Sequence, residues 1–180
     1  MVGDLGRAAR ILKQGGIVAY ATEYCFGLGC DPHNRAAVRR LLRVKRRPVS
    51  KGLIVVGADV RQLTPYVEEF PHAVLASWPG PHTWLLTPRP GIPRWITGKH
   101  PRIALRLTAH PQAAALCRAV GMAIVSTSAN RACESPARNY REVLRRLGTD
   151  VDYVLPGIVG DAPAPTPIRD AVTGDVVRPG

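Results

Sequence analysis

The sequence has 180 residues, of which 46% are hydrophobic and 21% are charged, a composition typical of a folded globular protein. This balance excludes an intrinsically disordered chain, and no apolar run approaches the ~20 residues that a membrane-spanning helix needs. Lys and Arg number 25 against 13 Asp and Glu, and the resulting net charge of +12 indicates an anionic partner such as nucleic acid, a nucleotide or a lipid headgroup, or else only a basic surface.

The chain begins with a predicted helix and strand. Leucine and alanine recur at helical spacing over residues 4–14, which predicts a helix that ends at Gly15-Gly16. The apolar run 17–20 predicts a strand, and we expect a loop containing Gly27 and Gly29 to follow it.

The next predicted helix is amphipathic, with Asn34 as its N-cap. One face of this helix carries Val38, Leu41, Leu42 and Lys45. Arginines occupy the other face. Pro48 ends the helix, because the residue before a proline disfavours the helical conformation.

The rest of the chain alternates between strands and helices. Strands are predicted over 53–56, 83–86, 103–107, 123–127 and 153–155, and two more from Ile168 to Val172 and from Val176 to Arg178. Helices are predicted near 59–66, 71–78 and 111–120 and around Val143, Leu144 and Leu147, and prolines between 88 and 93 predict a loop. This interleaving predicts one α/β domain over residues 1–180, built on a mixed sheet.

Small polar residues follow one of these strands. The stretch Ser126-Thr127-Ser128-Ala129-Asn130 stands where the chain leaves a buried strand, and ligands of open α/β sheets bind at such carboxyl ends. Its hydroxyls and carboxamide suit phosphate or ribose oxygens, although such residues also favour turns and helix caps. Thr22 ends the strand 17–20 in the same way, so we expect one shared cleft.

A basic loop follows the amphipathic helix. Lys45-Arg46-Arg47-Pro48-Val49-Ser50-Lys51 carries four cations in seven residues, which repel one another unless an anion lies between them. Lysine and arginine together suit a polyphosphate, and the alternative is a solvated surface loop.

Arg106 lies inside the apolar strand 103–107, where an unpaired charge is costly. Either the carboxylate of a ligand or an internal Asp or Glu would satisfy it. The four cysteines, Cys25, Cys30, Cys117 and Cys133, form no C-x-x-C pair and lie at no zinc-site spacing from a histidine. They predict a reduced, cytoplasmic protein without a metal site. A thiol nucleophile has little support, because Cys25 has no histidine near it in sequence.

Several spaced motifs occur in the order found in the YrdC/TsaC family, which the sequence resembles over essentially its whole length. They are Gly15-Gly16-Ile17-Val18-Ala19-Tyr20-Ala21-Thr22-Glu23, Phe26-Gly27-Leu28-Gly29, Lys45-Arg46-Arg47-Pro48, Arg106, Ser126 to Asn130, Ile168-Arg169-Asp170 and Arg178-Pro179-Gly180. The sequence differs from the family pattern at Ala21, Tyr24 and Thr166, and Arg131-Ala132-Cys133 stands in place of the usual Leu-Ser-Gly.

The resemblance implies a twisted sheet of parallel and antiparallel strands with flanking helices and a basic central cavity. It implies the synthesis of L-threonylcarbamoyladenylate from L-threonine, bicarbonate and ATP, with Mg²⁺ bound to ATP, no prosthetic group and diphosphate as the leaving group. The product would serve threonylcarbamoyl-adenosine formation in tRNA through downstream threonylcarbamoyl transferase proteins, and direct tRNA or RNA binding is an open possibility.

The resemblance also implies where each substrate binds. The ATP site would comprise Lys45, Arg47, Ser126, Ser128, Asn130 and Arg178. The L-threonine site would comprise Thr22, Arg106 and Thr166. No side chain is an obvious nucleophile or strong base, so catalysis is expected to come from positioning and from the charges of Lys45 and Arg47.

Two other readings remain open at this point. A non-catalytic RNA-binding protein would suit the net charge, although only 6% of the residues are aromatic and base stacking has few platforms. The second alternative is a different carbamoyl-transfer enzyme, because a related domain occurs in hydrogenase-maturation proteins. Those chains are much longer and carry zinc-finger-like cysteine pairs, which this sequence lacks.

Overall fold

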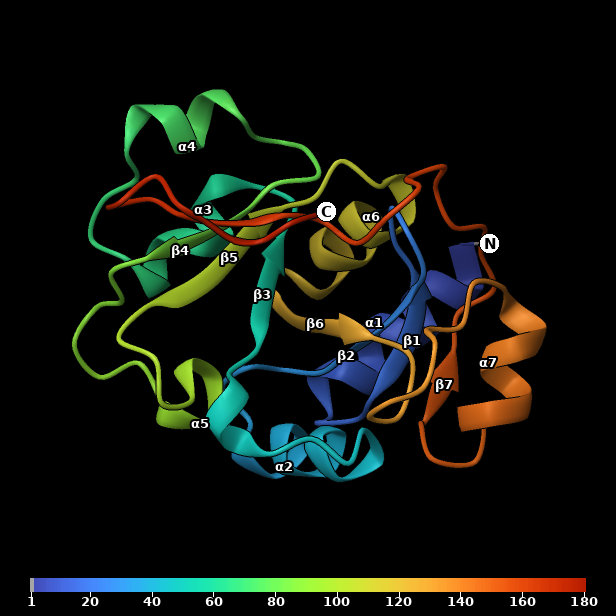
Figure 1. The fold of residues 1–180 in the computed structure, drawn as a ribbon. Helices are drawn as coiled ribbons and strands as arrows, with labels where there is room; N and C mark the ends of the chain where they lie inside the picture. The colour runs from blue at the N-terminus through green and yellow to red at the C-terminus, as the bar shows by residue number, and fades with distance from the viewer. Residues whose placement is uncertain (1) are drawn as a thin grey trace.

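A nine-stranded mixed sheet forms the centre of the computed structural model, which describes residues 2–180 (Figure 1). The strands are β1 (Val18–Ala21), β2 (Phe26–Gly29), β3 (Ile54–Gly57), β4 (Thr83–Leu86), β5 (Ile103–Leu107), β6 (Ile124–Ser128), β7 (Tyr153–Val154), β8 (Ile168–Asp170) and β9 (Val176–Arg178). Their order is β7-β1-β2-β6-β3-β5-β4-β8-β9. The pairs β1–β7, β3–β5 and β4–β8 are parallel and the other neighbours are antiparallel, so the predicted mixed sheet is confirmed.

Helices cover both faces of the sheet (Figure 1). They are α1 (Val2–Lys13), α2 (Arg35–Val44), α3 (Val60–Leu63), α4 (His72–Ala76), α5 (Arg94–Thr97), α6 (Pro111–Val120) and α7 (Tyr140–Leu147), with 3₁₀ turns at Val49–Lys51 and Thr64–Tyr66. Helices α1 and α6 pack together against one face, whereas α2 and α7 contribute to the core on the other. Asn34 caps α2 as predicted, by accepting a hydrogen bond from the backbone N–H of Ala37 at 3.0 Å.

The alternation of side chains along the strands decides which residues share a face. Tyr20 of β1, Val56 of β3 and Ile124 of β6 belong to the core beneath α1 and α6. Directly paired residues of neighbouring strands lie on the same face of a sheet, and Arg106 pairs with Val56. Ser126 lies two residues beyond Ile124 and therefore also faces this side. Arg106 and Ser126 thus lie on the same face of the sheet as the core that packs against α1 and α6.

The sequence prediction was wrong around Gly27 and Gly29, which form strand β2 rather than a loop. Glycine usually indicates a turn, but here its missing side chain allows close strand packing. A Cβ at Gly29 would lie 2.8 Å from Cε1 of Tyr20 and 3.0 Å from the backbone oxygen of Val125. Helix α5 was also missed, because it is a single turn directly after Pro93, where the prolines had predicted only a loop.

We expect Gly29→Ala to lower the free energy of unfolding by about 1–3 kcal/mol, because the added methyl group overpacks a fully buried ring. The control, Gly6→Ala in α1, meets nothing within 4 Å and should raise it by about 0.5–1 kcal/mol through helix propensity. Urea denaturation measures both values. Equal effects of the two substitutions would contradict the close packing of β2.

Candidate active site

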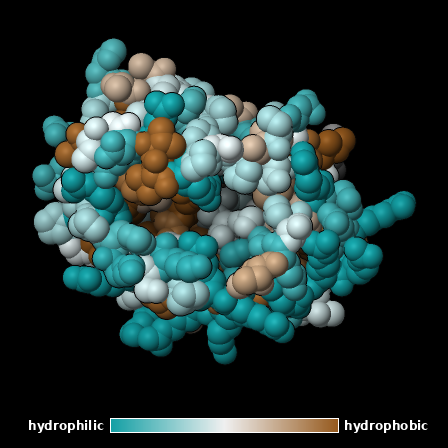
Figure 2. Space-filling model, in the orientation of Figure 1, coloured by the Kyte–Doolittle hydropathy of each residue, from teal (hydrophilic) through white to brown (hydrophobic). Residues whose placement is uncertain are grey.

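A cavity of about 830 Å³ lies over the polar part of this sheet face. Figure 2 shows the molecular surface hollowed near its centre. The strand ends of β1, β5 and β6 line the cavity on one side, and the proline-rich segment 162–168 lines it on another. The predicted site residues that line it are Thr22, Arg47, Arg106, Ser126, Ser128, Asn130, Thr166 and Arg178. The shared cleft expected from the sequence is therefore present.

Lys45 differs from the other predicted site residues, because it is not part of the described cavity lining. Its side chain is buried, and its Nζ donates hydrogen bonds to the backbone oxygens of Ser128 and Asn130, the latter at 2.9 Å. In return, the backbone oxygen of Lys45 accepts from the N–H of Ala132 at 2.9 Å. Lys45 therefore connects the start of the basic loop to the polar residues at the end of β6 without lining the cavity itself.

The buried position of Lys45 also changes its acidity. Burial and the nearby charge of Arg47 lower the pKa of Lys45 to about 8. At neutral pH the ammonium is still mostly protonated and holds the two backbone oxygens. An anion bound in the neighbouring cavity would raise this pKa again.

Arg47 reaches the cavity from the start of the basic loop. Its Nη2 donates to the backbone oxygens of Gly52 at 3.0 Å and Lys51 at 3.3 Å, which fixes the guanidinium, whereas its buried Nε has no hydrogen-bond partner within residues 2–180. Gly52 adopts a φ of +63°, and a Cβ there would lie 2.8 Å from the backbone oxygen of Thr97, so the tight turn requires glycine. The loop thus presents a fixed cation with an unused donor.

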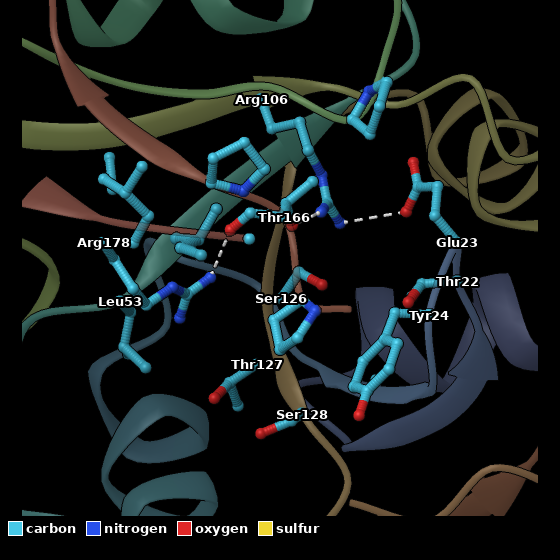
Figure 3. Close-up of a pocket in the computed structure, with 18 of the residues that line it drawn as sticks. Thr22, Glu23, Tyr24, Leu53, Arg106, Ser126, Thr127, Ser128, Thr166 and Arg178 are labelled. Carbon is cyan, nitrogen blue, oxygen red and sulfur yellow. Dashed lines mark hydrogen bonds and ion pairs between the residues drawn. The ribbon is translucent and has the colours of Figure 1, made fainter. Parts of the chain in front are cut away.

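Arg106 has an internal partner, which was one of the two alternatives left open by the sequence. Its Nη2 lies 3.4 Å from Oε2 of Glu23, and its Nη1 donates to Oγ1 of Thr166 at 2.6 Å (Figure 3). The backbone oxygen of Thr166 also accepts from Arg178 at 2.7 Å. The segment that carries Thr166 is therefore joined to the sheet by two arginines that face the cavity.

Glu23 is a cavity residue that the sequence analysis did not assign to the site. Its Oε1 accepts a hydrogen bond from Oγ1 of Thr108 at 2.6 Å. Burial alone would raise the pKa of Glu23, but the charge of Arg106 and the Thr108 hydrogen bond outweigh it, so the pKa lies below its usual value. The feature of the sequence that could have identified Glu23 as a site residue is its position directly after Thr22, at the end of β1.

Cys25 also lines the cavity, and its thiol is unsuited to nucleophilic attack. Burial raises the pKa of Cys25 to about 11, so the thiol stays protonated at neutral pH. This agrees with the low expectation for a thiol nucleophile from the sequence.

Residues 10–180 match the family Sua5/YciO/YrdC, described as "Telomere recombination". The chain belongs to this family. A curated family relative from Alkalilimnicola ehrlichii, named threonylcarbamoyl-AMP synthase, is 54% identical over 176 residues, which cover 95% of this chain and 92% of the relative.

Solved structures agree with the family assignment. The crystal structure of P. abyssi Sua5 complexed with L-threonine is 28% identical with a TM-score of 0.87, and the match covers 93% of this chain and 51% of that one. The crystal structure of E. coli YciO is 28% identical with a TM-score of 0.84, and the match covers 98% and 88% of the two chains. The fold predicted from the YrdC/TsaC resemblance is therefore confirmed.

The lowered pKa of Lys45 predicts a pH dependence of stability. Unfolding returns the lysine to its ordinary pKa of 10.5, so between about pH 8 and this value the unfolded chain binds more protons than the folded one, and stability rises with pH. In Lys45→Met this contribution is absent. We expect the difference in unfolding free energy, wild type minus variant, to grow by about 2 kcal/mol from about pH 7.5 to about pH 9.5. Denaturation curves at both pH values measure it, and an unchanged difference would contradict the lowered pKa.

Proposed function

We propose that the protein is a threonylcarbamoyl-AMP synthase, which joins L-threonine, bicarbonate and ATP and releases diphosphate. The observation that carries this proposal is the 54% identity, across nearly the full length of both chains, to a relative with that name. The cavity supports it, because its lining gathers the residues expected for ATP and those expected for L-threonine.

The arrangement of side chains supports a division of the cavity into two parts. Thr22 and Glu23 lie on one side in Figure 3, Arg106 extends toward Glu23 from the middle of the view, and Arg178 lies on the other side. The hydroxyl-bearing end of β6 runs between them. We place L-threonine beside Thr22 and Arg106, with Thr166 above it, and the triphosphate beside Arg47, Arg178 and the β6 end.

The reaction has two steps in this proposal. The ammonium of L-threonine first loses a proton to solvent, and the neutral amine nitrogen then forms a bond to the carbon of bicarbonate with loss of water, which gives a carbamate. A carbamate oxygen then bonds to the α-phosphorus of ATP while the bond to the β-phosphate bridging oxygen breaks and diphosphate leaves. Arg47 and Arg178 would offset the negative charge that develops on the phosphates, and the cavity walls would hold the labile carbamate beside its target.

Mg²⁺ is expected to enter with ATP, because its preferred ligands are oxygens such as those of phosphates and water. The described residues contain no group of three or more His, Cys, Asp and Glu side chains that would form a metal site. The protein residues that would face such a metal–nucleotide complex are the cations of the basic loop and the hydroxyls of Ser126 and Ser128. When bound, the metal would add positive charge at the phosphates.

We expect Arg47→Ala to reduce L-threonine-dependent diphosphate release by about 10²-fold, the size of one lost charge contact to a transition state. The matched control is Arg145→Ala, which removes an exposed arginine of α7 that is not part of the described cavity lining and should retain wild-type turnover. Diphosphate is measured with and without L-threonine. A wild-type rate that does not depend on L-threonine would refute the proposed function, whereas near-normal turnover of Arg47→Ala would refute only the role of this arginine.

We further propose that tRNA binds directly to the outer side of α2. Arg39, Arg43 and Arg46 are exposed there and line a surface hollow that also includes Arg47. This hollow therefore adjoins the cavity. The lower edge of the molecule in Figure 2, over α2, is strongly hydrophilic. Exposed arginines without a described ion-pair partner suit a phosphodiester backbone.

We place the reaction in the cytoplasm, where thiols stay reduced, since all four cysteines are free. No helix among residues 2–180 has the length and apolar character needed to cross a membrane.

The RNA proposal predicts a change in salt dependence. Replacing Arg39, Arg43 and Arg46 together by alanine should reduce the slope of log K against log salt by about 2, because each lost phosphate contact removes about 0.7–0.9. The control replaces three exposed cations of α1 and α6, which are Arg10, Lys13 and Arg118. Fluorescence anisotropy with labelled tRNA gives the slopes. Equal reductions in both variants would indicate a diffuse charge effect rather than a binding surface.

A further inference from the structure

Glu23 is anchored in a way that leaves one of its oxygens without a hydrogen bond from the described residues. Thr108 donates to Oε1 at 2.6 Å, and the hydroxyl of Thr108 itself accepts from the backbone N–H of His110 at 3.1 Å. Oε2 is buried without a hydrogen-bond partner among the described residues, and its nearest charge is Nη2 of Arg106 at 3.4 Å. An anionic oxygen in such a place is costly unless a donor reaches it. The carboxylate is therefore fixed in orientation but incompletely satisfied.

The charges around the cavity make this carboxylate exceptional. The described lining includes five cationic side chains, from Arg47, Lys51, Arg102, Arg106 and Arg178. Glu23 is the one carboxylate side chain among the described residues of that lining. The cations suit phosphate, bicarbonate and the carboxylate of an amino acid. A negative side chain would repel all three of these groups, so Glu23 needs a different partner.

On the proposed function, only one substrate group carries a positive charge. L-threonine at neutral pH bears an α-ammonium next to its carboxylate, whereas ATP and bicarbonate are anions. An amino acid whose carboxylate meets Arg106 has its ammonium one carbon away from the carboxylate carbon. Since Arg106 and Glu23 lie in ion-pair contact, both ends of that short zwitterion are matched by neighbouring side chains of opposite charge.

We propose that Glu23 is the residue that recognises the α-ammonium of the amino-acid substrate, through a charge-assisted hydrogen bond to Oε2. This inference rests on the proposed function and adds a specificity-determining residue to it. Glu23 and Arg106 then form a paired zwitterion site that selects α-amino acids over other carboxylates and places the amine on the Thr22 side of the cavity. The ammonium must lose its proton to solvent before the nitrogen can bond to the carbon of bicarbonate, so the charge attraction to Glu23 is absent once the carbamate has formed.

A purely structural role of Glu23 makes a different prediction. If Glu23 served only to orient Arg106, its loss would weaken the binding of every carboxylate ligand equally. If it contacts the ammonium, its loss would weaken only ligands that carry the amine. The ratio of affinities for L-threonine and for 3-hydroxybutyrate, which lacks the amine, therefore separates the two roles.

The test measures the dissociation constants of L-threonine and 3-hydroxybutyrate by calorimetry for wild type, Glu23→Gln, Glu23→Asp and Glu68→Gln. Glutamine keeps the size of the side chain and an acceptor for Thr108, aspartate keeps the charge, and Glu68→Gln makes the same charge change at an exposed position outside the described lining. We expect Glu23→Gln to bind L-threonine about 10²-fold more weakly and 3-hydroxybutyrate at least as well as wild type. Glu23→Asp should retain part of the preference and Glu68→Gln all of it.

An affinity ratio in Glu23→Gln that equals the wild-type ratio would overturn the inference. Thermal unfolding of each variant establishes that it is folded, and if Glu23→Gln does not fold, Glu23→Ala, which also removes the charge, carries the same comparison. L-threonine-dependent diphosphate release by the wild type is measured in parallel. If the wild type lacks it, the proposed function fails; if the wild type has it and the ratio is unchanged, only the role of Glu23 fails.

Discussion

The buried ammonium of Lys45 is the constraint on which the geometry of the cavity depends. It joins the end of α2 to the backbone oxygens of Ser128 and Asn130, two segments far apart in the sequence. The charge is removed from water, which disfavours it, but the backbone oxygens and the side-chain oxygen of Asn130 at 3.4 Å compensate. Because Lys45 fixes both segments, Arg47 and the hydroxyls of β6 face a common space without touching one another.

The cavity enclosed in this way has a strongly positive lining. The lining is rich in cations that have few internal anions, and such a cavity favours anionic ligands before any contact forms. Arg102 and Arg106 are exceptions: Arg102 lies 3.8 Å from a carboxylate oxygen of Asp170, and Glu23 and Thr166 hold Arg106 in place. A guanidinium that is held by a carboxylate and a hydroxyl keeps its orientation when the cavity is empty. Pre-organised charge of this kind suits a reaction in which labile intermediates must be positioned rather than attacked by a side chain.

The elements that sequence reasoning predicted well are those with a strong local signal. The face of α2 that includes Lys45 was recognised from its spacing, and Lys45 is indeed buried with its apolar neighbours. Strand β2 was missed because Gly27 and Gly29 are favoured in turns, and only the close approach of Thr22 to Gly27 and of Tyr20 to Gly29 explains why glycine suits this strand. Likewise, the sequence indicated that Arg106 needs a partner but not which one, because Glu23 follows β1 and Arg106 lies in β5, and these two strands are separated by three others in the sheet.

The turn after β6 illustrates how the chain accommodates its departure from the family pattern. Cys133 stands where the family usually has glycine, and it adopts a φ of +66°, a conformation that costs a residue with a side chain about 1 kcal/mol or more. Three interactions hold the turn nevertheless. The Asn130 amide donates to the backbone oxygens of Arg131 and Glu134, both at 2.8 Å, and the N–H of Ala132 donates to Lys45.

Arg131 adds an ion pair with Asp150 at 2.7 Å, an interaction for which the leucine usual at this position has no counterpart. The side chain of Asn130 is therefore engaged by the turn itself, and its amide group is not free to contact a nucleotide in this conformation. Its remaining contribution to the cavity is structural, because its oxygens accept from Lys45. The polar residues at the end of β6 therefore have two roles. Ser126 and Ser128 line the cavity, whereas Asn130, together with Lys45, holds the end of the strand in place.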